Sequence, residues 1–405
     1  MRAESFDYIN ECTAISAANE LESIAKWWLE HSFDSNNGGF WGQIDNNAKP
    51  LREAEKGIVL NTRILWFFSE LAASIKNESS ESAAHRAYEY LLSHFLDAAS
   101  GGFYWSLDYK GQVVDAKKQV YAQCFAVYAL CSYYKLTGDE QAKTLAYSTF
   151  ELIEHYALDR EHGGYIEACS REWGAIDDYR LSDKDLNCPK SMNTHLHVLE
   201  AYTSIHQVNP NENTESALKH ALSVFLDKIV TDDGAHLNLF FDMQWTCLSH
   251  EVSYGHDIEA SWLIHEAAEV LEDEQLIYQA TEVALKLANV CRENSIADSG
   301  YVLDEYNTRT KKVSNSSYWW VQAEALVGFY NAYQLTRERK YLEAVNQIWQ
   351  FIQEEHKDCG EWLWLARSQG GEHLNYKAGF WKGPYHNGRA MLELVKRFKG
   401  ATANV

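Results

Sequence analysis

The chain has 405 residues, 46% of them hydrophobic, and a formal net charge of -22 at pH 7. This size allows a substantial core, and the acidity disfavours nucleic acid and anionic membranes as partners because both carry negative charge. We expect a cytoplasmic protein, because no signal peptide is visible and the eight cysteines form no C-x-x-C pair. The apolar run Ile64–Phe68 is also too short to cross a bilayer.

A glycine followed by aromatic or alternating residues recurs six times, at intervals of 60 to 70 residues. Each interval holds two helical patterns, for example Gln119–Lys135 and Asp139–His155 after the second glycine. The chain has only 4 prolines, which favours uninterrupted helices. The pattern predicts an all-α fold in one catalytic domain over 1–405. We expect an (α/α)6 barrel of six helix-hairpin repeats with short β-loops at one mouth; an open helical solenoid is the alternative. The six marker glycines are Gly39, Gly102, Gly164, Gly234, Gly300 and Gly360.

Polar residues that can carry chemistry lie in the first helical stretch after several markers. In the first repeat, Arg63 interrupts an apolar helix over residues 58–68, and an unpaired buried charge is costly, so Arg63 must find partners or water. Tyr121 opens the corresponding helix of the second repeat. In the third repeat Asn193, His197 and Glu200 follow helical spacing and share one helix face.

The last three repeats continue this pattern. Taken singly, each residue has an ordinary structural explanation such as packing or ion pairing. In a closed barrel all of them would point into one cavity. Three histidines there would suit proton abstraction beside a carbonyl, because histidine titrates near neutrality. The 14 Trp, 24 Tyr and 16 Phe favour a sugar substrate, since aromatic rings stack on sugars. The residues concerned are His256 and Glu259, then Trp319, Trp320, Gln322 and Glu324, then Trp381, His386 and Arg389.

Four segments, taken with their order and spacing, resemble sequence blocks of the cellobiose 2-epimerases, which belong to the N-acylglucosamine 2-epimerase superfamily. They are Asn193–Thr203, Ser253–Trp262, Trp319–Ala325 and Trp381–Arg389. Residues 62–67 also resemble the arginine block of that family. The resemblance extends over nearly the whole chain and implies an (α/α)6 barrel, in agreement with the repeat pattern.

The resemblance also implies roles for ten residues. His256 and His386 would be the acid and base at C2 of the sugar, assisted by His197. The substrate-binding residues would be Arg63 at the developing enediolate, Asn193 at the open-chain sugar, Glu259 and Tyr121 along the site, Trp319 and Trp381 against the sugar rings, and Asp185 at a second sugar unit.

The chemistry explains why two histidines are needed. Inversion at C2 removes the proton beside the aldehyde and returns a proton to the opposite face of a cis-enediolate. We expect a neighbouring carboxylate such as Glu259 to raise the pKa of these histidines. No cofactor and no metal are expected, because no G-x-G-x-x-G or H-E-x-x-H motif occurs and His195 and His197 would lie on different helix faces.

The expected function is therefore an isomerase that interconverts the reducing-end glucose and mannose of β-1,4-linked disaccharides. A mannose 2-epimerase or an aldose–ketose isomerase would share the same intermediate. An inverting glycosidase would instead use two carboxylates roughly 6.5–9.5 Å apart, and a catalytically inactive sugar-binding module would show no turnover. The partner is a small-molecule sugar (cellobiose, mannobiose, lactose or mannose), and we expect a monomer or weak homodimer. The carboxylates available to a glycosidase are Asp257, Glu259, Asp304, Glu305 and Glu324.

Overall fold

The computed structural model describes residues 12–183, 185–370 and 376–403, and within them the chain forms twelve α-helices. The prediction of a mostly helical protein is confirmed. The helices are α1 Ala14–His31, α2 Ile58–Ile75, α3 Glu78–Tyr90, α4 Val120–Thr137, α5 Glu140–Tyr156, α6 Met192–Val208, α7 Glu212–Val224, α8 Tyr254–Leu271, α9 Glu274–Asn294, α10 Trp319–Thr336, α11 Arg339–Phe351 and α12 His386–Ala403. Three outer helices continue into π-helical turns, Leu91–Phe95, Phe225–Ile229 and Ile352–His356, and Arg367–Gln369 is a 3-10 turn.

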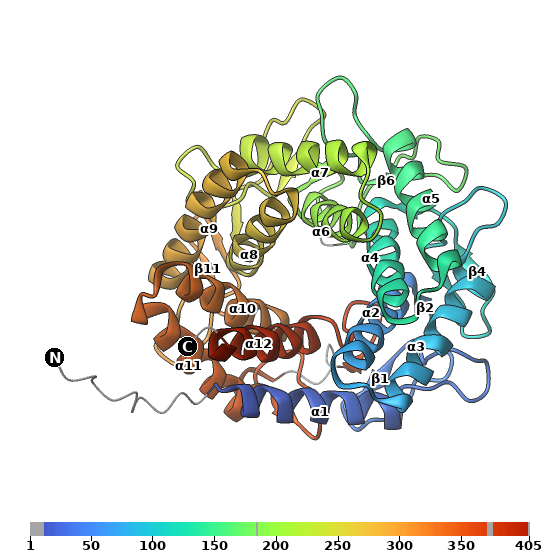
Figure 1. Cartoon of the computed structure of the whole chain (residues 1–405), viewed down its shortest axis with the longest axis horizontal. Helices are drawn as coiled ribbons and strands as arrows, with labels where there is room; N and C mark the ends of the chain where they lie inside the picture. The colour runs from blue at the N-terminus through green and yellow to red at the C-terminus, as the bar shows by residue number, and fades with distance from the viewer. Residues whose placement is uncertain (1–11, 184, 371–375, 404–405) are drawn as a thin grey trace.

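The helices form two concentric rings (Figure 1). The even-numbered helices make the inner ring, in which each contacts the next and α12 contacts α2. The odd-numbered helices pack around them, α3 on α2 and so on in chain order, while α1 packs on α12. The first and last helices of the chain therefore lie side by side and complete the two rings.

The residue patterns of the two rings explain their positions. In outer helix α5 the buried residues include Ala142, Ala146, Phe150 and Ile153, which form one stripe at helical spacing. Inner helix α4 is instead buried almost all round, because it packs between the outer ring and the centre. The predicted helical stretches in this repeat agree with α4 and α5 to within a few residues.

The marker glycines end the turns that follow the outer helices. All six have positive φ, between 60° and 97°, which a residue without Cβ adopts at no steric cost. Short antiparallel bridges such as Leu96 with Phe103 and Leu158 with Tyr165 lie beside them. Buried side chains at the start of the inner helices then bind this turn: Gln123 bonds both the N–H and the C=O of Phe103, and Gln322 does the same at Val302.

Short strands connect the turns to the inner helices. They pair antiparallel as β1 with β14, β2–β3–β4, β5 with β6, β7 with β8, β9–β10–β11 and β12 with β13. Because β2, β5, β7 and β9 run directly into α2, α4, α6 and α8, the N-terminal ends of these inner helices lie at the strand-bearing mouth. The strands are β1 Ile44–Asp45, β2 Lys56–Gly57, β3 Ser106–Leu107, β4 Val113–Asp115, β5 Lys118–Gln119, β6 Ala168–Cys169, β7 Lys190–Ser191, β8 Phe240–Phe241, β9 Glu251–Ser253, β10 Glu305–Asn307, β11 Val313–Ser314, β12 Lys357–Asp358, β13 Glu361–Trp362 and β14 Tyr376–Ala378.

The length and composition of one helix, α2, bear on the expectation that no apolar segment is long enough to cross a membrane. The apolar run Ile64–Phe68 alone is too short to cross a bilayer, but the helix that contains it, α2, is long and apolar enough by length and composition. Of its residues 78% are buried inside the protein, which is the environment of a core helix.

Candidate active site

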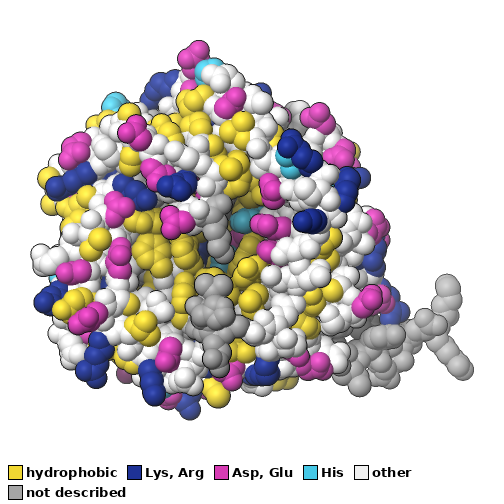
Figure 2. Space-filling model, turned by 180° about the vertical axis from the view of Figure 1, so that it is seen from behind, with side chains coloured by type: hydrophobic (Ala, Val, Ile, Leu, Met, Phe, Trp, Pro, Cys, Tyr) yellow, Lys and Arg dark blue, Asp and Glu magenta, His cyan; other side chains and the backbone are white. Residues whose placement is uncertain are grey.

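All ten residues predicted for the site line a single cavity of about 510 Å³ at the mouth of the inner ring. Most of them lie in the first two turns of inner helices, so the strands that begin those helices also position the site. Figure 2 shows a face of the molecule with a hollow near its centre, and histidine side chains are visible at the base of this hollow. The ten residues are Arg63, Tyr121, Asp185, Asn193, His197, His256, Glu259, Trp319, Trp381 and His386.

The histidines His256 and His386 have different hydrogen-bond partners. Nδ1 of His256 lies 2.8 Å from the Ser253 hydroxyl, which is neutral. Nδ1 of His386 lies 2.7 Å from the Glu324 carboxylate. In both cases the bond to Nδ1 leaves Nε2 free to exchange a proton. Burial lowers the pKa of both histidines to about 3, so both imidazoles are neutral at pH 7 in the protein alone.

Trp320 lies between these two histidines. Its ring centre is 4.8 Å from that of His256 and 5.7 Å from that of His386. The adjacent Trp319 also lines the cavity but is only 3% exposed and packs on Trp364. The sequence predicts a site role for Trp319 and none for Trp320, although Trp320 lines the cavity as well.

The third histidine, His197, pairs with a carboxylate of its own helix. Its Nδ1 lies 2.9 Å from Oε2 of Glu200, three residues later on α6. The edge of Tyr121 packs against its ring at 4.8 Å. Burial lowers the pKa of His197 despite the carboxylate. His195 points elsewhere, because its Nε2 accepts a hydrogen bond from the Tyr165 N–H, as the different helix faces of His195 and His197 predict.

One expectation about the electrostatics is wrong. Glu259 does not pair with a histidine; its Oε1 accepts a hydrogen bond from Arg389 Nη2 at 2.5 Å. The carboxylates beside the histidines are Glu200 and Glu324, and even there the net pKa shift of each histidine is downward, because burial outweighs the carboxylate.

Arg389, on α12, joins the carboxylates of three other inner helices. It donates to Glu200 on α6, Glu259 on α8 and Glu324 on α10. The Tyr385 hydroxyl also donates to Glu200, at 2.6 Å. The sequence pattern indicates Arg389 as a polar residue of the sixth repeat without a role in the site, and it does not indicate Tyr385. Their role depends on partners 65 to 189 residues away, which no local pattern reveals.

Glu259, Glu324 and His386 bring possible metal-ligand atoms within 4.8 Å of one another. Arg389 already supplies a positive charge to both carboxylates, so it would repel a metal ion there. We therefore assign these groups to the arginine cluster and not to a metal site.

Arg63 provides a second buried cation at the cavity. Its guanidinium donates to the Trp381 carbonyl at 2.7 Å and to the Tyr121 hydroxyl at 2.8 Å, and it lies over the Phe125 ring. The partners that the buried charge requires are thus a carbonyl, a hydroxyl and an aromatic ring. No ion pair of Arg63 with a carboxylate is found among the described residues.

The outer part of the cavity is formed by loops and aromatic side chains. Asp185 lies in a loop, where its carboxylate accepts from the Ser182 N–H at 2.8 Å. Asn193 and Trp381 are partly exposed on the wall. Residues that the site prediction omitted also line it: Leu181, Ser182, Asp183, Asp304, Glu305, Tyr318, Trp320 and Trp364.

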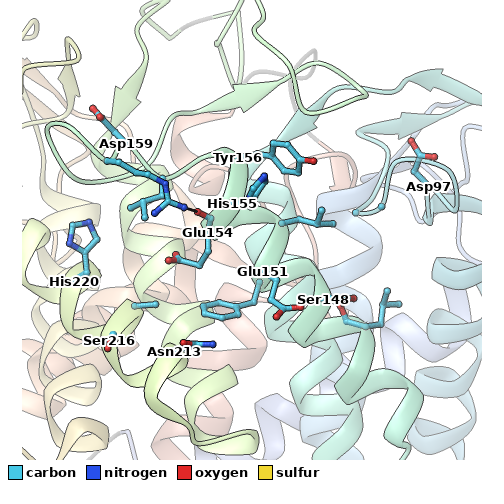
Figure 3. A pocket seen from close by; sticks show the side chains of 18 of the residues that line it. Asp97, Ser148, Glu151, Glu154, His155, Tyr156, Asp159, Asn213, Ser216 and His220 are labelled. Atoms are coloured by element: carbon cyan, nitrogen blue, oxygen red, sulfur yellow. Dashed lines mark hydrogen bonds between the residues drawn. The ribbon is translucent and has the colours of Figure 1, made fainter.

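A larger hollow of about 1220 Å³ lies outside the inner ring, between α5 and α7 (Figure 3). Its wall includes Glu154, whose carboxylate accepts hydrogen bonds from the hydroxyls of Tyr165 and Tyr202. None of the ten predicted site residues lines this hollow. The smaller cavity is therefore the candidate active site.

Comparisons of the sequence and of the structure with known proteins agree with each other. The sequence model of the family described as N-acylglucosamine 2-epimerase matches residues 39–390. A cellobiose 2-epimerase from Bacteroides fragilis is 43% identical over 92% of this chain and 95% of its own length. One from Dictyoglomus turgidum is 36% identical over 98% of each chain. The solved structure of the cellobiose 2-epimerase from Bacillus thermoamylovorans superposes with a TM-score of 0.89 and 35% identity, covering 95% of this chain and 99% of that one.

Proposed function

The chain belongs to the N-acylglucosamine 2-epimerase family and is a sugar 2-epimerase acting on disaccharides, and we propose here how its site performs the isomerisation. The substrate in this proposal is a β-1,4-linked disaccharide whose reducing-end glucose and mannose interconvert. The observation that carries the mechanism is the convergence of His197, His256 and His386 on one cavity.

His256 and His386 exchange the C2 proton on opposite faces of the sugar. When the C2–H bond faces His256, its neutral imidazole takes the proton, and the electron pair forms the C1–C2 double bond of a cis-enediolate. His386, which in this proposal takes up a proton from solvent and is stabilised as an imidazolium by Glu324, then delivers that proton to the other face. The partners support this assignment, since the Ser253 hydroxyl is neutral whereas the Glu324 carboxylate stabilises a cation. In the reverse direction the two histidines exchange roles.

The negative charge of the enediolate is stabilised by donors that are already oriented. Arg63 is held by the Trp381 carbonyl and the Tyr121 hydroxyl and has no carboxylate partner among the described residues, so its charge remains available to the sugar. His197, fixed by Glu200, reaches the same cavity. Donors of this kind are each worth about 3 kcal/mol in a water-excluded site. When the sugar opens and the C1–O5 bond breaks, one of the three histidines takes the proton of the O1 hydroxyl and gives it to the ring oxygen, which leaves the aldehyde at C1.

The rest of the cavity holds the sugar units. Trp319 and Trp381 lie against the rings, Asn193 binds the open-chain unit, and Asp185 binds the second unit from its loop. With these residues in place the site needs no cofactor in this proposal.

We also propose that the two rings of helices are a closed (α/α)6 barrel of six helix hairpins in one catalytic domain over 1–405. The contacts of α12 with α2 and of α1 with α12 support this interpretation. A cytoplasmic location and a monomer or weak homodimer complete the proposal.

An inverting glycosidase remains the competing enzyme class. Of its candidate carboxylates, Asp257 is bound to His236 and to the Leu237 N–H, and it is not part of the cavity wall. Glu324 is held by Arg389, His386 and the Trp262 indole. These contacts leave neither group free to protonate a leaving group or to activate water.

Incubation of the protein with cellobiose and analysis of the products by proton NMR tests the function. We expect glucosyl-mannose. Free glucose would identify a glycosidase, a ketose would identify an aldose–ketose isomerase, and exclusive turnover of free mannose would identify a monosaccharide epimerase. No turnover of any of these sugars would contradict the proposal.

A further inference from the structure

The three carboxylates around Arg389 differ in their access to the sugar. Glu259 lies on α8, three residues after His256, so the two side chains share a helix face. Glu259 lines the 510 Å³ cavity, whereas Glu200 and Glu324 are not part of its wall. Glu259 is therefore the member of this cluster that can touch the substrate.

The carboxylates also differ in how many donors stabilise their charge. Glu200 accepts from Arg389, from the Tyr385 hydroxyl and from His197. Glu324 accepts from Arg389, from the Trp262 indole at 3.1 Å and from His386. For Glu259, Arg389 is the one donor recorded among the described residues. Because hydrogen bonds stabilise a buried carboxylate, Glu259 is the poorest of the three at holding a negative charge.

The net charge of the site also favours a proton on one of the carboxylates, and Glu259 is the one that holds a negative charge least well. Around it the structure buries two guanidinium groups, of Arg63 and Arg389, and three carboxylates. In the resting site, where His256 and His386 are neutral, these groups sum to one negative charge, and a single added proton makes the resting site neutral. A net charge buried in a site of low dielectric is costly, which favours that proton.

We propose that Glu259 is a neutral carboxylic acid in the working enzyme, and that its O–H donates a hydrogen bond to the enediolate that forms on the sugar. This inference rests on the proposed function, and it names the contribution of Glu259 to that reaction. The carboxyl keeps its proton throughout, so no bond is made or broken at Glu259. A neutral acid in such a position combines a strong donor with the absence of a repelling negative charge.

Electrostatics support the proton on Glu259. Burial and the nearby charges of Glu324 and Glu200 raise its pKa to about 8, and they outweigh the opposing effect of Arg389. The titratable and charged groups that surround it come from every inner helix: Arg63 on α2, Tyr121 on α4, His197 and Glu200 on α6, His256 on α8, Glu324 on α10, and Tyr385, His386 and Arg389 at α12.

The variant Glu259→Gln tests this role because an amide is neutral and can donate. We expect it to retain kcat within about tenfold of the wild type, whereas Glu259→Ala loses on the order of 10²–10³, the usual effect of removing such a donor. The wild-type rate should fall as pH rises through about 8, because the proton then leaves Glu259, and the Gln variant should lack this alkaline limb. Glu324→Gln is the matched control in the same cluster. It should be as impaired as an Ala variant, since Glu324 acts as a carboxylate.

Loss of activity in Glu259→Gln equal to that in Glu259→Ala, or an unchanged alkaline limb in the Gln variant, would overturn the proposal. A second readout does not depend on turnover. The infrared difference spectrum of wild type minus Glu259→Gln should contain the C=O stretch of a protonated carboxyl at neutral pH, and this band should disappear above about pH 8. Its absence at neutral pH would contradict the neutral acid. If the band is present but no sugar epimerises, the proposed function has failed and the protonation has not.

Discussion

Nδ1 of His386, the first residue of α12, lies 2.7 Å from Oε1 of Glu324 on the neighbouring inner helix α10. The two residues are 62 positions apart in the sequence, and the packing of α10 against α12 brings them together. The same carboxylate accepts from Arg389. In the proposed mechanism, a proton carrier is thus fixed to the cluster that joins four inner helices.

The first prediction concerns the two proton carriers. His256→Ala and His386→Ala should each reduce kcat on cellobiose by about 10³-fold or more, because no other group replaces the lost acid or base. Far-UV circular dichroism should remain that of the wild type. His206→Ala, also on an inner helix but bonded to Thr214 outside the cavity, is the control and should retain activity. Substantial turnover by either His256→Ala or His386→Ala would contradict the acid/base assignment.

The second prediction concerns Trp381. Its partly exposed ring lies on the cavity wall, where it can stack on a sugar ring. Trp381→Ala should raise the KM for cellobiose by roughly tenfold, corresponding to about 1.4 kcal/mol of lost stacking. Trp381→Phe keeps an aromatic face and should have the smaller effect. An unchanged KM in the Ala variant would remove Trp381 from substrate binding.

The third prediction concerns Arg389. Removal of this buried cation in Arg389→Met leaves Glu200, Glu259 and Glu324 without their common partner, and loss of one side of a buried ion pair costs about 3–5 kcal/mol. Urea unfolding should show a decrease of that size in the free energy of unfolding. The matched control is Arg180→Met at the exposed Arg180–Asp178 pair, where about 0–1 kcal/mol is expected. Equal losses in the two variants would refute the stabilising role of Arg389.

The fourth prediction concerns acid stability. Burial lowers the pKa of His356 to about 4, against 6.5 for an ordinary histidine. Between these values the unfolded chain binds a proton that the folded protein does not. Stability is therefore retained above pH 6.5 and falls as the pH drops toward 4, by about 1.4 kcal/mol per pH unit for this group.

The variant His356→Gln should accordingly lose less of its unfolding free energy between pH 6.5 and 4 than the wild type does. His155→Gln, at an exposed residue of α5, is the control and should follow the wild-type curve. Thermal unfolding monitored across this pH range gives the comparison. If His356→Gln follows the wild-type curve as well, the buried neutral histidine does not contribute to the acid sensitivity.

Local patterns explain why so much of the fold could be predicted. The glycine markers were recognised because positive φ values limit the residue type at these turns, and Gly102 and Gly164 adopt φ of 68° and 76°. Helices such as α4 and α5 follow from stripes of apolar residues, which the sequence displays directly. Most of the candidate residues converge because they lie near the beginning of an inner helix, whereas Asp185 and Trp381 lie in loops.

The contacts between repeats could not be predicted in the same way. The pairing of Arg389 with Glu200 depends on how α12 and α6 face each other, which no sequence spacing encodes. For that reason Glu259 was wrongly expected beside a histidine. The sequence predicts Trp319 against the sugar rings, whereas Trp320 is the tryptophan that lies between the histidines. Adjacent residues on a helix point in different directions, and the sequence does not say which one lies there.

The most direct test of proton exchange at C2 is the epimerisation of cellobiose in heavy water followed by NMR. The mechanism predicts that glucosyl-mannose carries deuterium at C2, because the histidine that returns the proton exchanges with solvent before delivering it. With His386→Ala it predicts no deuterated glucosyl-mannose, because no group then delivers a proton to the second face of C2. Full conversion to an epimer that retains the original hydrogen at C2 would contradict two-histidine exchange through an enediolate.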